Sequence, residues 1–404
     1  METSHNPVRH LQYLRQSLAQ DSKPISYFLS AGCPLSVEMD NGKWPLIPDV
    51  RGLSLYINKE LSGNKTYQIL ITELKKSGRN PENVEHVLSF TRGLLEVAKG
   101  GTVRGLEENE LVDLDELVCR KVGEKVNVLL PETETPYLKL AKWINSIDRK
   151  IPIEIFTTNY DLLMEQALDS LEMPYFDGFV GSRRPFFDLK AVEDNLMPSH
   201  WSRLWKVHGS INWYSEKIQD VTKVYRSSEI KNEASKLIYP SHLKYDESRK
   251  MPYFALIDQL NKFIRQKSSF LILSGYSFSD DHLNGTIANA LKANPTAMVL
   301  GLMYGEYDDG GKPRYTKAYE LAKKQHNLNI WTFDKAIIGT NVGHWKLPDV
   351  DEDIDPDISS FIETVDDPDG NASKNRGVKL GDFAKFTEFL KRTIGVQEEV
   401  LHGQ

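Results

Sequence analysis

Short apolar runs that alternate with helical stretches are the feature that most constrains the fold of this chain. The runs are Ile25–Leu29, Ile153–Phe156, Leu204–Val207, Phe270–Leu273, Ala297–Met303 and Asn329–Phe333. Most of them are apolar throughout and are followed by polar turns, which is typical of parallel strands buried on both faces. Strands that alternate with helices favour a doubly wound α/β fold built on a Rossmann-like parallel sheet.

Composition narrows the class of protein. A chain of 404 residues is long enough for about two or three domains. No apolar run approaches the ~18 residues of a membrane span, and the N-terminus lacks a signal-peptide core, so we expect a cytoplasmic protein without membrane contact. The net charge of −7 argues against direct binding of the whole chain to nucleic acid, because Lys and Arg drive such binding.

The hydrophobic pattern divides the chain into four predicted segments. They are an N-terminal helix with the first part of the Rossmann-like domain (1–63), a helical insertion (64–148), the remainder of the Rossmann-like domain (149–345), and an acidic linker with a C-terminal helix (346–404). Leu11, Leu14 and Leu18 recur at helical spacing and predict the N-terminal helix. We expect the insertion to form a wall or lid beside a bound ligand.

The C-terminal segment combines dense negative charge with an apolar stripe. From Asp349 to Asp369 there are ten Asp or Glu residues and no Lys or Arg, which predicts a mobile or partner-facing tether. Beyond it, apolar residues follow a helical repeat at Phe383, Phe386, Leu390 and Ile394. Asp382 is predicted to cap this helix and Gly395 to stop it. The stripe could dock within the chain or, with the acidic stretch as a tether, against a neighbouring chain.

Polar residues follow three of the predicted strands. Ser30 to Pro34 forms a turn after the first strand, Thr157 to Asp161 follows the second, and Lys206 to Ser210 follows the third. Ligands of open α/β sheets bind outside the carboxyl ends of the strands, so the polar side chains after the second and third strands are predicted to converge on one pocket. Small residues in the first turn would let backbone N–H groups approach a pyrophosphate.

These motifs resemble those of the sirtuin superfamily. Ser-Ala-Gly-Cys-Pro is similar to its Gly-Ala-Gly loop, Thr-Thr-Asn-Tyr-Asp to its Thr-Gln-Asn-Ile-Asp motif, and Val-His-Gly to its catalytic His-Gly. Gly-Tyr-Ser at Gly275 to Ser277 resembles its ribose-binding turn. With all four elements in order, the chain is most similar to sirtuin-like NADases of bacterial anti-phage defence.

The resemblance implies roles for individual residues. Asn159 would position the nucleophilic water or the ribose hydroxyls, and His208 would be the general base that takes a ribose hydroxyl proton. Histidine suits that role because its ordinary pKa is about 6.5. The implied nucleotide-binding residues are Ala31, Gly32, Cys33, Asp161, Gly209, Gly275 and Ser277. Among these, Asp161 would contact the nicotinamide amide.

The cysteine count bears on metal binding. Cys33 and Cys119 are the only cysteines, so the chain cannot build the four-cysteine zinc site of the sirtuin deacetylases. We expect no metal in this chain, with NAD⁺ as a substrate. Asp280, Asp281 and His282 are not interpreted as a metal site, because adjacent side chains rarely point one way. Asp281 is instead predicted to cap a helix that begins near His282.

The leading hypothesis is hydrolysis of NAD⁺ to ADP-ribose and nicotinamide, acting in anti-phage defence by NAD⁺ depletion. Unregulated hydrolysis would kill the host cell, so we expect a homo-oligomer under external control. The resemblance to stand-alone sirtuin-like defence proteins implies a HerA-type hexameric ATPase as the partner, with nucleic acid reached only through that partner. Two alternatives stay open: a protein deacylase or ADP-ribosyltransferase, and a catalytically silent nucleotide-binding scaffold for an ATPase.

Overall fold

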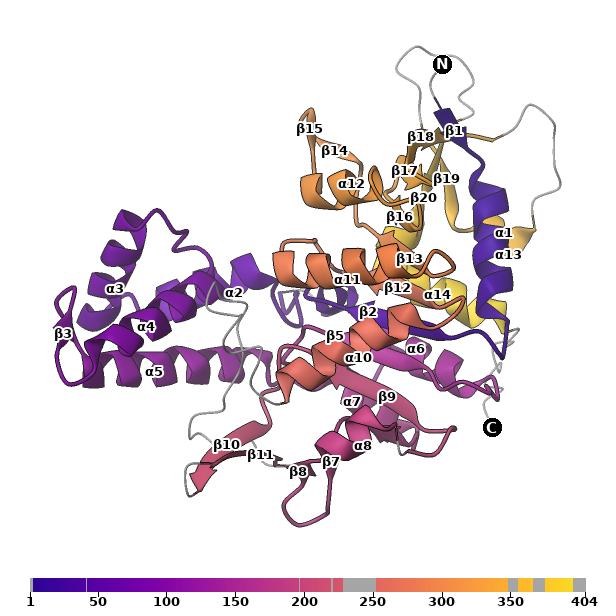
Figure 1. Cartoon of the computed structure of the whole chain (residues 1–404). Coiled ribbons are helices and arrows are strands. Elements are labelled where there is room, and N and C mark those ends of the chain that lie inside the picture. Colours follow the sequence, from indigo (N-terminus) through magenta and orange to yellow (C-terminus); the bar gives the residue numbers. More distant parts are fainter. Residues whose placement is uncertain are drawn as a thin grey trace, which may run out of the picture.

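A computed structural model describes residues 3–40, 42–195, 197–218, 221–227, 252–347, 355–365 and 375–394 (Figure 1). Among these residues, ten strands form one sheet in the order β1-β18-β17-β16-β13-β12-β2-β5-β9-β6. In that order the strands are Thr3–His5, Asn341–Trp345, Lys335–Ile338, Leu328–Trp331, Met298–Leu302, Phe270–Ser274, Ile25–Leu29, Glu154–Thr157, Ser202–Lys206 and Tyr175–Phe176.

The seven strands from β16 to β6 in this order run parallel to one another. The strand β17 is antiparallel to both β16 and β18. Every predicted strand lies in the parallel part, with small differences at its ends. The strands β9, β5, β2, β12, β13 and β16 lie side by side in the 3-2-1-4-5-6 order of Rossmann folds. The order reverses between β2 and β12, and ligands of such sheets bind at that switch point.

Successive residues of the central strands enter two different cores, one on each face of the sheet. Tyr27 and Leu29 of β2 belong to one core and Phe28 belongs to the other. Ile155 and Phe156 of β5 are divided in the same way. Burial on both faces explains why the strand sequences are continuously apolar, and it confirms the predicted α/β class with a mainly parallel sheet.

Helices cover both faces of the sheet (Figure 1). The core that contains Phe28 is completed by α8 (Leu189–Glu193), α10 (Tyr253–Arg265), α11 (Asp281–Ala293) and α12 (Thr316–Ala322). The core that contains Tyr27 receives α1 (Pro7–Leu18), α6 (Pro136–Asn145), α7 (Leu163–Ser170) and α14 (Phe383–Thr393). The leucines that predicted the N-terminal helix are the buried face of α1.

A group of helices extends from one side of the sheet, at the left of Figure 1. They are α2 (Val50–Glu60), α3 (Lys65–Lys76), α4 (Val84–Ala98) and α5 (Glu108–Val126), with a hairpin of β3 (Thr102–Val103) and β4 (Leu106–Glu107). The hairpin and α2 are not part of the predicted pattern. At the other end of the predicted insertion, α6 packs against α7 and α14. The proposed domain boundaries stay predictions.

Smaller elements complete the described part of the chain. A second sheet contains β7 (Phe179–Val180), β8 (Phe186–Phe187), β10 (Trp213–Ile218) and β11 (Val221–Arg226). Two-stranded pairs are formed by β14 (Asp308–Asp309) with β15 (Lys312–Pro313) and by β19 (Ile362–Thr364) with β20 (Arg376–Val378). The short helical segments are η1 (Cys33–Ser36), α13 (Pro356–Ser359) and η2 (Lys379–Gly381).

The C-terminal helix is found where it was predicted, but its apolar stripe is buried within the chain. The Asp382 side chain accepts the Ala384 N–H as the predicted cap, and the predicted stop, Gly395, lies outside the described residues. Phe383, Phe386, Phe389 and Leu390 are at most 2% exposed. The Phe386 ring centroid lies 6.0 Å from that of Tyr27 on β2. The hypothesis that this stripe contacts a neighbouring chain is therefore wrong, because β2 and α6 already cover it.

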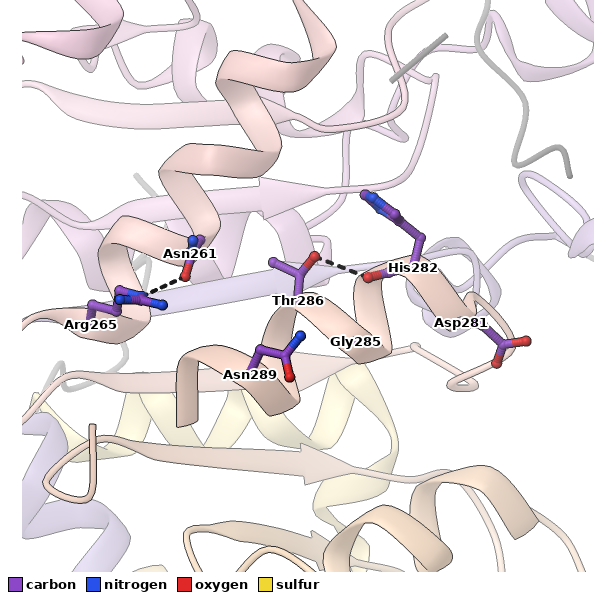
Figure 2. Close-up of a pocket in the computed structure, with 7 residues that line it drawn as sticks. All are labelled: Asn261, Arg265, Asp281, His282, Gly285, Thr286 and Asn289. Carbon is purple, nitrogen blue, oxygen red and sulfur yellow. Dashed lines mark hydrogen bonds between the residues drawn. The ribbon is translucent and has the colours of Figure 1, made fainter. Parts of the chain in front are cut away.

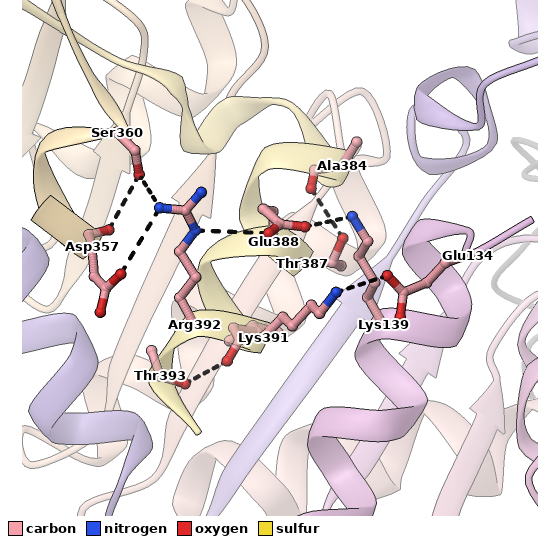
Figure 3. A network of polar contacts seen from close by, with 11 residues as sticks. Glu134, Lys139, Asp357, Ser360, Ala384, Thr387, Glu388, Lys391, Arg392 and Thr393 are labelled. Carbon is pink, nitrogen blue, oxygen red and sulfur yellow. Dashed lines mark hydrogen bonds and ion pairs between the residues drawn. The ribbon is translucent and has the colours of Figure 1, made fainter. Parts of the chain in front are cut away.

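Polar contacts also join α14 to its surroundings (Figure 3). Lys391 Nζ lies 3.0 Å from Glu134 Oε2, before α6, and Arg392 donates to the Ser360 hydroxyl at 3.0 Å. Such exposed pairs typically contribute about 0–1 kcal/mol each, so burial of the aromatic face supplies most of the attachment.

The described part of the acidic stretch is ordered structure and not a free tether. Asp355 pairs with Arg15 of α1 at 2.6 Å, and Ile358 and Phe361 are buried. The prediction of a mobile segment is wrong for residues 355–365, because two apolar side chains among the acidic residues reach the core. The other residues of the stretch lie outside the described residues.

Candidate functional site

The loops after β2 and β12 cross at a pair of glycines. The Gly32 N–H donates to the Gly275 carbonyl at 3.0 Å. A Cβ on Gly32 would lie 2.7 Å from Gly275 Cα, and Gly275 has φ +67°, a backbone conformation that favours glycine. These glycines let the two loops meet at the switch point of the sheet. The Gly32 amide, predicted to face a pyrophosphate, is engaged in this crossing.

Cys33 faces the protein interior. Its N–H donates to the Ser30 carbonyl at 2.9 Å and its Sγ to the Ser274 carbonyl at 3.2 Å. Burial raises the pKa of the thiol far above its ordinary value. Ala31, Gly32 and Cys33 are among the residues predicted to bind a nucleotide. Within the described part of the chain, the backbone N–H groups of Gly32 and Cys33 have partners and that of Ala31 has none. A pyrophosphate contact by this loop therefore depends on Ala31.

The strand register brings Asn159 and His208 to adjacent strand ends. Thr157 of β5 pairs with Lys206 of β9, and Asn159 and His208 each follow these partners at the same offset. Asn159 Nδ2 donates to the Ser30 carbonyl at 3.3 Å, which attaches the carboxamide to the end of β2. Three neighbouring strands thus contribute polar groups to one edge of the sheet, and the predicted convergence on one pocket stays a prediction.

Asp161 is buried beside a lysine that the sequence interpretation missed. Asp161 is 6% exposed, and its side-chain Oδ1 accepts the Leu163 N–H at 3.0 Å. Lys206 Nζ donates to the Asp161 carbonyl and, at 2.8 Å, to Glu165 Oε1, while its side chain is only 1% exposed. Burial raises the pKa of the Asp161 carboxyl to about 6, and the Lys206 ammonium opposes that rise. A lysine inside an apolar strand was the available signal, because a buried charge requires partners.

The His208 side chain lies beside the carboxylate of Asp280, which follows a strand that is not adjacent to β9. His208 Nε2 lies 3.2 Å from Asp280 Oδ2, and the two side chains are 8% and 9% exposed. β5 and β2 lie between β9 and β12, so the two strands are roughly 14 Å apart at ~4.8 Å per strand. The loops that carry His208 and Asp280 therefore lean over the carboxyl ends of β2 and β5.

Asp280 also starts the following helix. Its Oδ1 accepts the N–H groups of His282 and Leu283 at 2.9 and 3.2 Å, which makes Asp280 the N-cap of α11. The prediction that Asp281 caps this helix is wrong by one residue. Asp281 is the first helical residue and pairs with Lys317 at 2.6 Å.

The remaining predicted residues differ in accessibility. Gly209 is buried with φ +92°, and its N–H donates to the Lys206 carbonyl at 3.0 Å, so it shapes the turn that carries His208. Ser277 is exposed and its hydroxyl lies 2.7 Å from that of Ser279. Its predicted contact with a ribose stays a prediction.

A polar groove lies between α10 and α11 and does not include Asn159, Asp161, His208 or Asp280 (Figure 2). It is lined by Asn261, Arg265, Asp281, His282, Gly285, Thr286 and Asn289. Arg265 Nε is bonded to Asn261 Oδ1 at 2.9 Å on its own helix. Neither Asn159 nor His208 lines this groove, so it is separate from the residues to which we assign the chemistry.

Two further properties concern only the part of the chain that the structure describes. No three His, Cys, Asp or Glu side chains there are grouped to hold a metal ion, and the absence of a metal stays a prediction. None of the described helices combines the length and the apolar character needed to cross a membrane.

One of three comparisons with known proteins, the match to a family model, agrees with the motifs. Residues 153–327 match the model of a family described as SIR2-like domain. A solved structure of a Sir2 point mutant with a p53 peptide and NAD matches 78% of this chain and 98% of that chain, with 13% identity and a TM-score of 0.30, which is too low to carry an argument. None of the curated proteins matches the chain. The segment that carries Asn159, His208 and Asp280 is therefore similar to a SIR2-like domain, which supports a relation to the sirtuin superfamily.

Proposed function

We propose that this protein hydrolyses NAD⁺ at the bond between nicotinamide and ribose. The observation that carries the proposal is the placement of Asn159 and His208 at paired positions of adjacent strand ends, beside the switch point of the sheet. Both residues lie in the segment that is similar to a SIR2-like domain. That similarity supports the use of NAD⁺, and the choice of water as acceptor is the finer part of the proposal.

The proposed reaction divides the work among buried polar groups. As the bond between C1′ and the nicotinamide nitrogen breaks, its electron pair leaves with nicotinamide and positive charge builds on the ribose. Water then forms the new bond to C1′. Asn159, held through Nδ2 by Ser30, would orient that water with Oδ1. His208 would accept the proton that the water or a ribose hydroxyl releases.

Other residues are assigned to binding. The Asp161 carboxylate would accept the nicotinamide amide N–H, and the Ala31 amide would donate to the pyrophosphate. Ser277, exposed on the turn after β12, would bond the adenosine ribose. Gly32, Cys33, Gly209 and Gly275 would shape the turns, because their own polar groups or backbone angles serve local contacts.

The setting we propose is anti-phage defence in the cytoplasm, by depletion of NAD⁺. An enzyme that consumes NAD⁺ without restraint kills its own cell, so we propose a homo-oligomer controlled by a HerA-type ATPase. The sequence motifs support this setting through their resemblance to such systems. Because the aromatic stripe of α14 is buried, assembly contacts must use other surfaces.

Nicotinamide release by the purified protein tests the proposal. The protein is incubated with NAD⁺, alone and with the product of a neighbouring ATPase gene, and nicotinamide and ADP-ribose are measured by chromatography. We expect equal amounts of the two products. A parallel reaction with acyl-lysine peptides, followed by mass spectrometry, separates the deacylase alternative: deacylated peptide with O-acyl-ADP-ribose would reject water as the acceptor. Tight NAD⁺ binding without turnover in every combination would favour the scaffold alternative.

A further inference from the structure

The turn between β12 and α11 is held in an unusual backbone conformation. Phe278 has φ +58°, although its side chain is completely buried. A bulky residue rarely adopts the left-handed region, so surrounding contacts must hold the turn in place. The same turn delivers Asp280 to His208.

Asn284 supplies those contacts from the interior. Its Nδ2 donates to the Phe278 carbonyl at 2.7 Å, and its Oδ1 accepts the Tyr276 hydroxyl at 2.9 Å. Its backbone N–H donates to the Asp280 carbonyl at 2.9 Å. Asn284 is 5% exposed and therefore binds the turn on the side away from solvent. The position of Asp280 is thus fixed by the first turns of α11.

The two oxygens of Asp280 serve different groups. Oδ1 accepts the backbone N–H groups at the start of α11, whereas Oδ2 faces His208 Nε2 at 3.2 Å. A carboxylate accepts hydrogen bonds and cannot donate them, so a carboxylate at this distance favours the imidazole proton on Nε2. In neutral imidazole the other nitrogen, Nδ1, is then the acceptor.

We propose that Asp280 is a positioning residue for His208. It holds the ring through Nε2 and thereby sets the orientation of the imidazole beside the ends of β2 and β5. The proposal rests on the NAD⁺ hydrolysis assigned above. A capping aspartate would need only one oxygen; the second oxygen, brought across the ends of two strands, orients the base.

Asp280→Asn separates the two roles of this side chain. Asn is as good an N-cap as Asp, so Oδ1 can still accept from the start of α11. The amide no longer enforces a proton on Nε2. We expect kcat to fall at least about 10-fold with KM within about 2-fold, as when other catalytic imidazoles lose their carboxylate. Asp188→Asn is the matched control, because Asp188 caps α8 through Ala191 N–H at 3.1 Å, and it should leave both constants unchanged.

A second measurement is independent of turnover. Nitrogen NMR of histidine-labelled protein reports the tautomer of each imidazole, and the His208 signals are assigned by their loss in His208→Gln. We expect the wild-type protein to carry its proton on Nε2, and Asp280→Asn to show a tautomer mixture. A wild-type tautomer and a wild-type kcat in Asp280→Asn would overturn the proposal. If the wild-type protein releases no nicotinamide but its tautomer depends on Asp280, the positioning role stands and the proposed function falls.

Discussion

The loop after β2 and the ends of β5 and β9 lie at the same edge of the sheet, yet their polar groups are used differently. In the loop, the amides of Gly32 and Cys33 are bonded to other parts of the protein. Asn159 and His208 follow the adjacent strands β5 and β9, and their side chains contact the loops after β2 and β12. A position at the ligand-binding edge therefore does not make a residue a ligand contact. The loop mainly joins two strands, whereas our proposal assigns the chemistry to the ends of β5 and β9.

The largest expected effect tests the chemical side of this comparison. Asn159→Ala and His208→Ala should each lower NAD⁺ cleavage at least ~100-fold, because orientation of the nucleophile and proton transfer each contribute on that scale. Steady-state nicotinamide release and thermal melting are measured together. Asn341→Ala and His326→Ala are matched controls at exposed positions and should retain full activity. If both site variants keep more than roughly a tenth of wild-type turnover with unchanged melting, the site is assigned to the wrong residues.

The next effect tests the structural support of the loop. η1, which follows the β2 loop, packs on α14, and Phe386 of α14 is fully buried against Tyr27. Phe386→Ala should lower the free energy of unfolding by about 3–5 kcal/mol, as large aromatic truncations in cores do. Denaturant titration measures the loss. Lys391→Ala, which removes an exposed ion pair on the same helix, should cost less than about 1 kcal/mol. Equal small losses in both variants would show that α14 is not part of the core.

A smaller loss of stability is expected at the glycine crossing. Gly32→Ala places a Cβ 2.7 Å from the Gly275 backbone, and overpacking of this kind costs about 1–3 kcal/mol. Gly285→Ala is the matched control, because nothing lies within 4 Å of its Cβ position in α11. That control should gain about 0.5–1 kcal/mol from helix propensity. If Gly32→Ala melts like the wild-type protein but no longer cleaves NAD⁺, the loop takes part in NAD⁺ binding or cleavage and does more than join two strands.

The pH dependence sharpens the role of Asp161. Its folded-state pKa of about 6 is raised from 3.8 by burial, so the folded protein holds this proton more tightly than the unfolded chain does. The stability contribution is full below pH 3.8 and is lost as pH rises through about 6. Relative to Asp161→Asn, the wild-type free energy of unfolding should fall over that interval. In the proposed reaction, NAD⁺ cleavage should rise as pH passes through about 6, because the carboxylate is a stronger acceptor for the nicotinamide amide than the protonated carboxyl group is. A flat difference between the two unfolding curves would contradict the burial of an ionisable Asp161.

The smallest expected effect is that of metal removal. With two cysteines in the chain, chelation should leave melting and NAD⁺ cleavage unchanged. Elemental analysis before and after chelation provides the check. Stoichiometric zinc whose removal unfolds the protein would refute this expectation.

The sequence predicted the strands and the polar groups at their ends because both depend on local pattern. Continuous apolar runs such as Ile25–Leu29 indicate burial on both faces, and polar residues after them indicate the binding edge. The pairing of His208 with Asp280 could not be predicted in this way, because it joins loops whose strands are separated by two others. A carboxylate at the end of β12 was visible, but its direction depends on the turn that Asn284 holds.

The tail was misjudged for a related reason. The density of negative charge around Asp355 predicted a mobile tether. The segment is instead ordered, because Ile358 and Phe361 are buried in the core. Spacing on the terminal helix indicated an apolar face but not what covers it. The covering surface, β2 with α6, is distant in sequence and is brought close only by the complete sheet.

The burial of α14 against β2 also has a consequence for how the chain matures on the ribosome. β2 is among the first strands to be synthesised, whereas α14 is synthesised near the end. The face of β2 that packs against α14 therefore stays uncovered through most of translation. At roughly 5–20 residues per second, this interval is on the order of 20–70 s. The nascent chain cannot close the core beneath the loop that follows β2 before residues 383–393 leave the exit tunnel. A truncated product that lacks α14 leaves this face of β2 without its cover.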